Sequence, residues 1–188
     1  MEDPIEDVKE YSTSLPIYSF ANTEEATLYG IEIDGRKNLD FIGKAWANYY
    51  LSGNFSYNKS EVSLTEEQQT KFTNNNRPLQ GLSPYVANLT GGYDSDDRSV
   101  ALNFNYMDER IRKVGIIAFG VPEQDQYETP PILLDLVWTE KFEYGYPLEF
   151  KIKVGNILDD ETVWKEGDRV TRYFKTGPTL DMKISTKF

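Results

Sequence analysis

The sequence predicts an all-β fold, and specifically an antiparallel portion of a transmembrane β-barrel. Its 188 residues contain several stretches of about ten residues in which apolar and polar side chains alternate, as they do along a strand with one apolar and one polar face. The connections between these stretches alternate between short and long. This asymmetry is typical of a membrane barrel with brief turns on one side and extended loops on the other.

The last stretch shows the alternation most clearly, with Leu180, Met182 and Ile184 opposite Asp181 and Lys183. Counting back from it gives about seven strands. A turn or bulge near Asn22 to Glu25 would raise the count to eight. The expected strands are residues 16–34, 45–57, 85–93, 100–112, 132–139, 148–154 and 179–188, with short connections over 35–43, 94–98 and 143–146 and long ones over 59–83, 113–129 and 156–178.

The two ends of the chain carry further expectations. Residues 1–14 are acidic and lack periodicity, which predicts a loop or a disordered lead, with barrel sequence over 15–188. The first residues contain neither a basic region nor an apolar run, so we do not expect them to be a secretory signal. For an outer-membrane protein, this predicts that the chain is not the complete precursor.

A soluble β-sandwich would also show alternating strands, and it is the main alternative on pattern alone. The apolar face of a sandwich favours Val, Ile and Leu, whereas here Tyr, Phe and Trp gather near strand ends, as in the girdles of a barrel. We therefore expect Leu134 and Ile152 to face lipid at mid-strand. Polar residues of the other face should line the lumen and pair across strands; they are Asp135, Glu149, Lys151, Lys153, Asp181 and Lys183.

Composition excludes several classes of protein. No run approaches the roughly 20 apolar residues of a membrane helix, and mean hydropathy is −0.58. The net charge of −11 argues against nucleic acid or an anionic membrane surface as a partner and fits a cation-rich or neutral ligand, or no ligand. The chain has no Cys and no His, which removes disulfides, the usual zinc sites and the common nucleophile pairs. We expect no catalytic, cofactor-binding or metal-binding residues.

One block of sequence resembles a known family. Residues 77–89, Arg-Pro-Leu-Gln-Gly-Leu-Ser-Pro-Tyr-Val-Ala-Asn-Leu, are similar to a block near the end of the barrel in TonB-dependent outer-membrane receptors. The resemblance covers nearly the whole chain from about Pro16. Other pieces follow in the family's order; they are residues 26–32, 54–57, 105–115, 127–128, 134–135 and 156–159, and Phe188, which resembles the family's C-terminal assembly signal.

This resemblance implies a place in the outer membrane of a Gram-negative bacterium, as seven or eight strands at the C-terminal end of a 22-stranded barrel. It implies uptake of a scarce ligand, such as a ferric siderophore, cobalamin or an oligosaccharide, and no enzymatic activity. The implied partners are outer-membrane lipid, the remaining barrel and plug, TonB through an N-terminal part, and a small-molecule or metal-chelate ligand. Without the plug and the other strands, these residues would not transport actively. A small autonomous outer-membrane barrel is the runner-up.

The candidate ligand contacts are Trp164, Tyr173 and Phe174, because they are aromatic and lie in the last long connection, which a receptor would turn towards its ligand. Ordinary packing within the loop is the alternative. Two acidic clusters offer oxygen ligands for a hard cation, but a solvated turn and a plain acidic loop are the favoured interpretations. They are residues 94–97 and 159–161.

Overall fold

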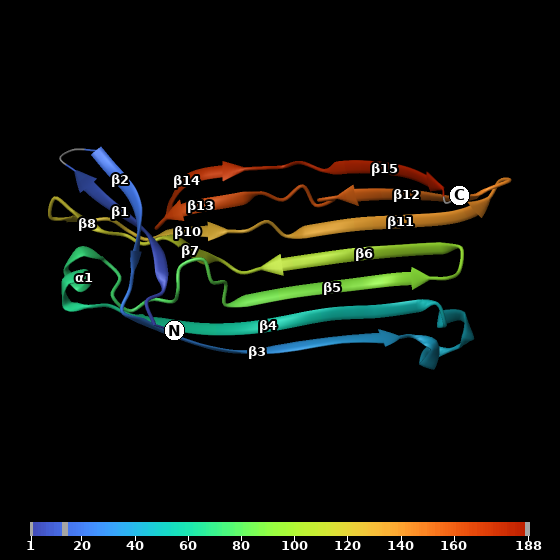
Figure 1. Ribbon diagram of the computed structural model, residues 1–188, viewed down its shortest axis with the longest axis horizontal. Coiled ribbons are helices and arrows are strands. Elements are labelled where there is room, and N and C mark those ends of the chain that lie inside the picture. The colour runs from blue at the N-terminus through green and yellow to red at the C-terminus, as the bar shows by residue number, and fades with distance from the viewer. Residues whose placement is uncertain (1, 13–14, 187–188) are drawn as a thin grey trace.

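The computed structural model describes residues 2–12 and 15–186, and its main element is a seven-stranded antiparallel sheet (Figure 1). The strands follow one another across the sheet in chain order, so the topology is an up-and-down meander. They are β3 (Glu25–Asn38), β4 (Tyr49–Ser63), β5 (Tyr85–Asp94), β6 (Arg98–Met107), β11 (Leu133–Glu143), β12 (Pro147–Gly155) and β15 (Thr179–Thr186). The count of seven agrees with the sequence prediction, but the first expected strand, residues 16–34, is broken near Asn22. Residues 15–22 form β2 (Leu15–Asn22) outside the main sheet, and β3 begins at Glu25. Lys187 and Phe188 lie outside the described residues, so the expected C-terminal signal is not tested.

The pairing register gives this sheet one apolar and one polar face. Ile152 is opposite Trp138 and Met182 on neighbouring strands, and rows of this kind continue across all seven strands. The apolar face includes Ile31, Phe55, Leu89, Leu102, Leu136, Ile152 and Met182. The polar face includes Asn54, Asn88, Asn103, Asp135, Lys153 and Asp181.

Side chains on the polar face bond across strands as expected. Asn88 Nδ2 donates to Asn54 Oδ1 at 2.7 Å, and the Lys153 ammonium lies 3.4 Å from an Asp135 carboxylate oxygen. On the apolar face, Met182 and Ile184 remain 63% and 71% exposed. Among the described residues no second sheet covers this face, so the chain is not a β-sandwich. Such a face suits contact with lipid.

The two ends of the main sheet differ, as the alternation of connection lengths predicts. Short connections lie at one end, at the right in Figure 1, with the C-terminal strand's last residues. They are residues 39–48, which contain η1 (Asp40–Ile42) and η2 (Lys44–Trp46), 95–97 and 144–146. The long connections, 64–84, 108–132 and 156–178, gather at the other end, which we call the loop end.

Two of the long connections are not irregular loops, which corrects the expectation from sequence. Within them lie β7 (Arg110–Lys113), β10 (Gln126–Thr129), β13 (Thr162–Glu166) and β14 (Arg169–Phe174), which form a four-stranded sheet in the order β14-β13-β10-β7. We call it the small sheet. Each of its strands adjoins a main-sheet strand in the chain, and a short hairpin of β8 (Ile117–Ala118) and β9 (Val121–Pro122) joins β7 to β10.

The expectation of a loop or disordered lead over residues 1–14 is also not met in full. Residues 5–12 form β1 (Ile5–Ser12), which pairs along its whole length with β2 (Leu15–Asn22). The acidic side chains of this segment gave no strand pattern. One of them, Glu6, is buried because it pairs with Arg77, which lies 71 residues further along the chain. The remaining long connection, 64–84, contains α1 (Glu66–Lys71), which starts at a capping box formed by Thr65 and Gln68. The Thr-Glu-Glu-Gln sequence is the signature of such a box.

No helix in the described part of the chain is long and apolar enough to cross a membrane.

We predict that Ile152→Arg lowers the free energy of unfolding of the barrel by about 2 to 4 kcal/mol, because its side chain lies at the middle of β12 on the apolar face. Leu134 is the second residue of β11 rather than a mid-strand residue, so Leu134→Arg should cost less. Denaturant titration of the receptor in lipid vesicles measures both. Ser185→Arg, on the polar face opposite Glu149, is the control. Equal losses for Ile152→Arg and Ser185→Arg would contradict the assignment of faces.

Candidate functional site

Most of the buried apolar side chains lie at the loop end. Val62 on β4 and its pair partner Ala26 on β3 continue the polar face of the main sheet, so this face turns from polar to apolar where the loops cover it. Segments from the other connections complete the cluster. Its members are Val8, Ala26, Val62, Leu64, Phe72, Ile111, Val114 and Ile116. The loops therefore have a packed core of their own and do not depend on lipid to order them.

The block 77–81 holds this core together by bonding to three elements at once. The Leu79 N–H donates to Ser60 Oγ on β4 at 2.9 Å, and the Gly81 N–H donates to the Ile111 carbonyl on β7 at 2.8 Å. The Gln80 side chain accepts from the Asp7 N–H of β1 at 2.7 Å. The first residues of the block that carries the family resemblance thus serve as a connector between the loops.

Arg77, at the start of this block, is fully buried with Glu6. Their side chains are 0% and 1% exposed, and Nη2 of Arg77 lies 2.5 Å from Glu6 Oε2. Nη1 donates to the Asn74 carbonyl at 3.1 Å, and the guanidinium carbon lies 5.0 Å from the centre of the Phe72 ring. A buried charge is tolerated only when it is paired and hydrogen-bonded. This pair consequently links strand β1 to the connection after α1.

The close packing around this pair explains one glycine. A Cβ atom at Gly115 would overlap the Glu123 carbonyl oxygen and approach Thr73 Oγ1. The Gly115 N–H itself donates to Asp125 Oδ1 at 2.7 Å, and its carbonyl accepts from the Thr73 N–H at 3.0 Å. Only a residue without a side chain allows these segments to approach so closely.

The small sheet has one face towards the core and one face away from it. Ile111 is buried in the core, and its pair partner Tyr127 packs against the same cluster. One position further along, Glu128 pairs with Arg110 on one side and with Trp164 on the other. Because successive side chains alternate between faces, these three lie on the face turned away from the core.

A pocket of about 480 Å³ joins this second face to the polar face of the main sheet. Asn88, Asn105 and Leu133 of the polar face line it together with Arg110 and Glu128, and Phe174 also contributes. The second face of the small sheet therefore continues the face that would line a barrel lumen. We call it the mouth surface; it comprises Arg110, Arg112, Glu128, Trp164, Arg172 and Phe174.

Trp164 lies at the centre of the mouth surface, where Glu128, Arg112 and Arg172 contact it. Its Nε1–H donates to Glu128 Oε2 at 2.9 Å, and Arg110 donates to the other oxygen of the same carboxylate. The guanidinium carbons of Arg112 and Arg172 lie 3.6 and 4.8 Å from the centre of the indole ring. Aromatic rings attract such cations electrostatically, so the tryptophan fixes two arginine side chains near each other.

The structure brings together two of the three predicted ligand contacts. Trp164 and Phe174 are in edge-to-face contact with ring centres 5.8 Å apart. Tyr173 pairs with Val163, which alternates with Trp164 along β13, so the tyrosine lies on the opposite face and is 68% exposed. Sequence reasoning missed the arginines. Alternation of Arg110 and Arg112 around Ile111 was the available signal, but their proximity to Trp164 depends on pairing between two connections.

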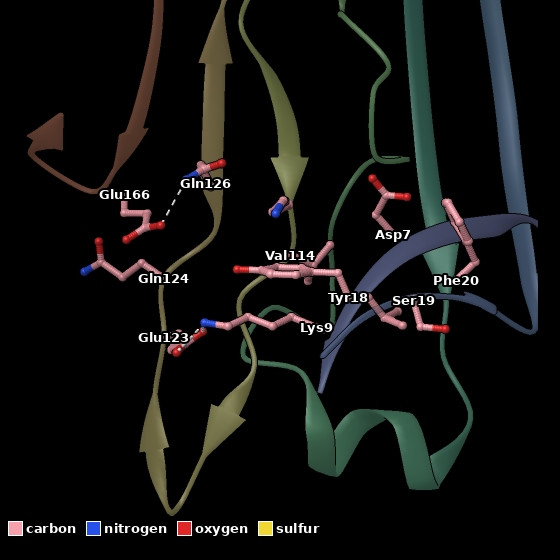
Figure 2. A pocket seen from close by; sticks show the side chains of 12 residues that line it. Asp7, Lys9, Tyr18, Ser19, Phe20, Val114, Glu123, Gln124, Gln126 and Glu166 are labelled. Atoms are coloured by element: carbon pink, nitrogen blue, oxygen red, sulfur yellow. Dashed lines mark hydrogen bonds and ion pairs between the residues drawn. The ribbon is translucent and has the colours of Figure 1, made fainter. Parts of the chain in front are cut away.

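A second pocket, of about 230 Å³, lies between the β1–β2 hairpin and the strands near β10 (Figure 2). The Lys9 ammonium lies 2.9 Å from the Glu123 carboxylate, and the Lys113 ammonium lies 3.8 Å from the centre of the Tyr18 ring. Burial lowers the pKa of Lys113, and the positive charge of Arg112 lowers this pKa further. Asp7 and Glu166 also line the pocket, so its charges are mixed.

Neither acidic cluster forms a metal site in the described residues, where no group of three or more carboxylates, Cys or His could hold an ion. The first cluster forms the turn between β5 and β6, in which the Arg98 N–H donates to Ser95 Oγ at 3.2 Å. In the second cluster, Asp160 accepts from the Ile132 N–H at 2.7 Å and Asp159 lies 3.3 Å from the Lys175 ammonium. Both clusters have structural partners.

Comparison with known proteins identifies the family. The model of a TonB dependent receptor-like β-barrel matches residues 4–136, well over half of the chain. The chain belongs to the TonB-dependent receptor family. One curated relative, the hemoglobin-haptoglobin utilization protein B of Neisseria meningitidis serogroup C, is 31% identical over 90 residues. These are 48% of this chain and 10% of the relative. No solved structure gives a significant match.

Membership has direct consequences for this chain. TonB-dependent receptors are transporters, not enzymes, and they reside in the outer membrane of Gram-negative bacteria. The chain is a part of such a barrel, because its seven-stranded sheet does not close: β3 and β15 lie at opposite edges. The match spans only a tenth of the relative's length. Because the chain belongs to this family and its sheet does not close, the small autonomous barrel and the soluble sandwich are set aside.

We predict that Glu6→Gln destabilises the loop end by about 3 to 5 kcal/mol, because it leaves the Arg77 charge buried without its counter-ion. Hydrogen exchange of the backbone amides of residues 60–81, measured in the receptor that contains this chain, would report the loss. Glu67→Gln is the matched control, because it removes a carboxylate from the exposed ion pair with Lys71. Unchanged protection in Glu6→Gln would show that the pair does not hold the loops.

Proposed function

We propose that this chain forms the C-terminal part of the barrel of a receptor that imports a scarce ligand, with the loop end as its ligand-facing surface. The match of residues 4–136 to the family carries this proposal. The arrangement of the loops supports it, because a packed core beside a half-exposed aromatic and cationic surface is a suitable platform for binding. These residues alone would not transport actively.

Two ligand classes are considered. A small ligand, such as a ferric siderophore, cobalamin or an oligosaccharide, is the class that the resemblance implied, and the 480 Å³ pocket at the mouth surface is within the range of small-molecule sites. The name of the curated relative adds a second class, a protein ligand of the hemoglobin-haptoglobin type. We favour the small ligand, because the mouth surface is concave where it meets the polar face of the main sheet.

We propose Trp164 and Phe174 as ligand contacts, because they meet on the mouth surface beside the pocket. Tyr173 is proposed as a contact as well, but from the other face of β14. Since β14 is an edge strand of the small sheet, a ligand that reaches Tyr173 must extend around this edge. A compact ligand should therefore contact only Trp164 and Phe174, whereas an extended ligand should contact Tyr173 as well.

The partners of the receptor follow from the open sheet. The unpaired edges of β3 and β15 would pair with further barrel strands, because an open sheet edge does not occur in lipid. A plug domain and TonB, contacted through an N-terminal part, are proposed on the family resemblance, and outer-membrane lipid would contact the apolar face. We propose no nucleic acid partner.

We predict that cells of the source bacterium lose uptake of one ligand when the gene for this receptor is deleted, and that the gene restores it. Iron-55 complexes of citrate and ferrioxamine B, labelled cobalamin and a hemoglobin-haptoglobin complex form the panel. Collapse of the proton gradient should abolish accumulation without abolishing surface binding, since import is energised from the inner membrane. Uptake of the whole panel unchanged by the deletion would refute the proposal.

We predict that Trp164→Ala and Phe174→Ala each weaken binding of that ligand about tenfold or more, as loss of a central aromatic contact does. Tyr173→Ala should change the affinity for a compact ligand less than twofold and the affinity for a protein ligand as strongly as the other two. Binding to the purified receptor measures this. If neither Trp164→Ala nor Phe174→Ala changed the affinity, the ligand would bind elsewhere.

A further inference from the structure

We propose that the ligand is anionic, and that its negatively charged oxygens bind Arg112 and Arg172 on the mouth surface. This inference rests on the proposed function and specifies the chemical class of the ligand at the same site. The two guanidinium groups flank Trp164 from two different connections, one from β7 and one from β14. The structure thus brings two positive charges to one ring.

In the described part of the chain, the ion pairs found include neither Arg112 nor Arg172. Those of the small sheet join Arg110 to Glu128 and Arg169 to Glu166. Arg112 donates to the uncharged Gln126 Oε1 at 2.8 Å. The Arg172 guanidinium lies near two rings, those of Trp164 and Phe174, at 4.8 and 5.7 Å from their centres. In a chain with net charge −11, these two arginines thus share one tryptophan ring, and the ion pairs found in the described residues include neither of them.

A cation held over an aromatic ring is stabilised without being neutralised, and the N–H groups at the edge of the guanidinium plane remain available. Arginine uses this edge to bind carboxylate or phosphate through two parallel hydrogen bonds. The indole ring is itself fixed by Glu128 through Nε1, so both arginines are positioned before a ligand arrives. Such preorganisation reduces the entropic cost of binding.

Other charged residues lie near the two arginines. Arg110 and Lys113 lie on the same short strand as Arg112, and Glu128 balances only Arg110. The mouth surface itself carries three arginines, Arg110, Arg112 and Arg172, and one carboxylate, Glu128. The acidic net charge of the chain suggests a cationic or neutral ligand. That charge is spread over the molecule, however, and at physiological salt interactions fade beyond about 8 Å. The local charge therefore decides.

The test compares two small ferric chelates of opposite charge on the purified full receptor. Ferric citrate is anionic and ferrioxamine B is cationic, and both are followed by iron-55 in equilibrium dialysis. Two variants are compared with wild type. The double variant carries Arg112→Gln and Arg172→Gln, and the single variant carries Arg172→Gln alone. The single variant replaces an exposed side chain and should not disturb folding. Arg169→Gln is the matched control, because Arg169 lies on the same strand and is already paired with Glu166 at 2.6 Å.

We expect the wild-type receptor to bind ferric citrate at least tenfold more tightly than ferrioxamine B. The double variant should lose about 30-fold in affinity for ferric citrate or more, Arg172→Gln should lose part of this, and Arg169→Gln should stay within twofold of wild type. Equal or tighter binding of ferrioxamine B would overturn the inference. An unchanged affinity for ferric citrate in the folded single and double variants would also overturn it. Binding of cobalamin or of the hemoglobin-haptoglobin complex in place of ferric citrate would do the same. Absence of binding across the whole panel would instead refute the proposed function.

Discussion

The main sheet depends on one constraint, which is that backbone N–H and C=O groups surrounded by lipid must bond to one another. Seven antiparallel strands in chain order satisfy this along their shared edges. Their register then places Ile152, Trp138 and Met182 in one row, so that most of the large apolar side chains of the strands emerge on the same side. A shift of one residue in any pair would move a row of polar side chains into the lipid. The alternation of the sequence and the pairing of the backbone are thus mutually dependent.

Beyond the membrane the constraint is different, because water can satisfy exposed backbone groups and the loops need another source of order. The apolar cluster around Ile111 provides burial, and the Arg77–Glu6 pair and the bonds of residues 79–81 provide specificity. A buried ion pair adds little net stability compared with apolar residues of the same volume, but removing one partner is costly. The pair therefore acts mainly by disfavouring arrangements in which β1 leaves its place.

The mouth surface uses this rigid support for a polar purpose. Its strands have the core on one face, so the other face is free to carry Trp164 and three arginines. Glu128 orients the indole and balances one arginine. Arg112 and Arg172 are held by an aromatic ring rather than by a carboxylate, so within the described part of the chain their N–H groups are not used in an ion pair. In a site of this kind the scaffold positions the arginines, and guanidinium N–H groups remain available as hydrogen-bond donors. Recognition of an anion requires both.

The sequence by itself determined the strands of the main sheet, the two faces, the turn end and the loop end, since a period of two and the lengths of connections are local properties of the chain. The sequence also contains the capping signature of α1 at Thr65 to Gln68, but the helix that follows is short and has no apolar period. Only the tertiary structure decided that β1 is a strand, that two long connections form a sheet, and that Trp164 meets Phe174 and two arginines while Tyr173 turns away. These features depend on pairing between short segments tens of residues apart. No local pattern encodes which of the possible partners such segments choose, because their choice follows from the burial of Glu6, Arg77 and Ile111 in one shared core.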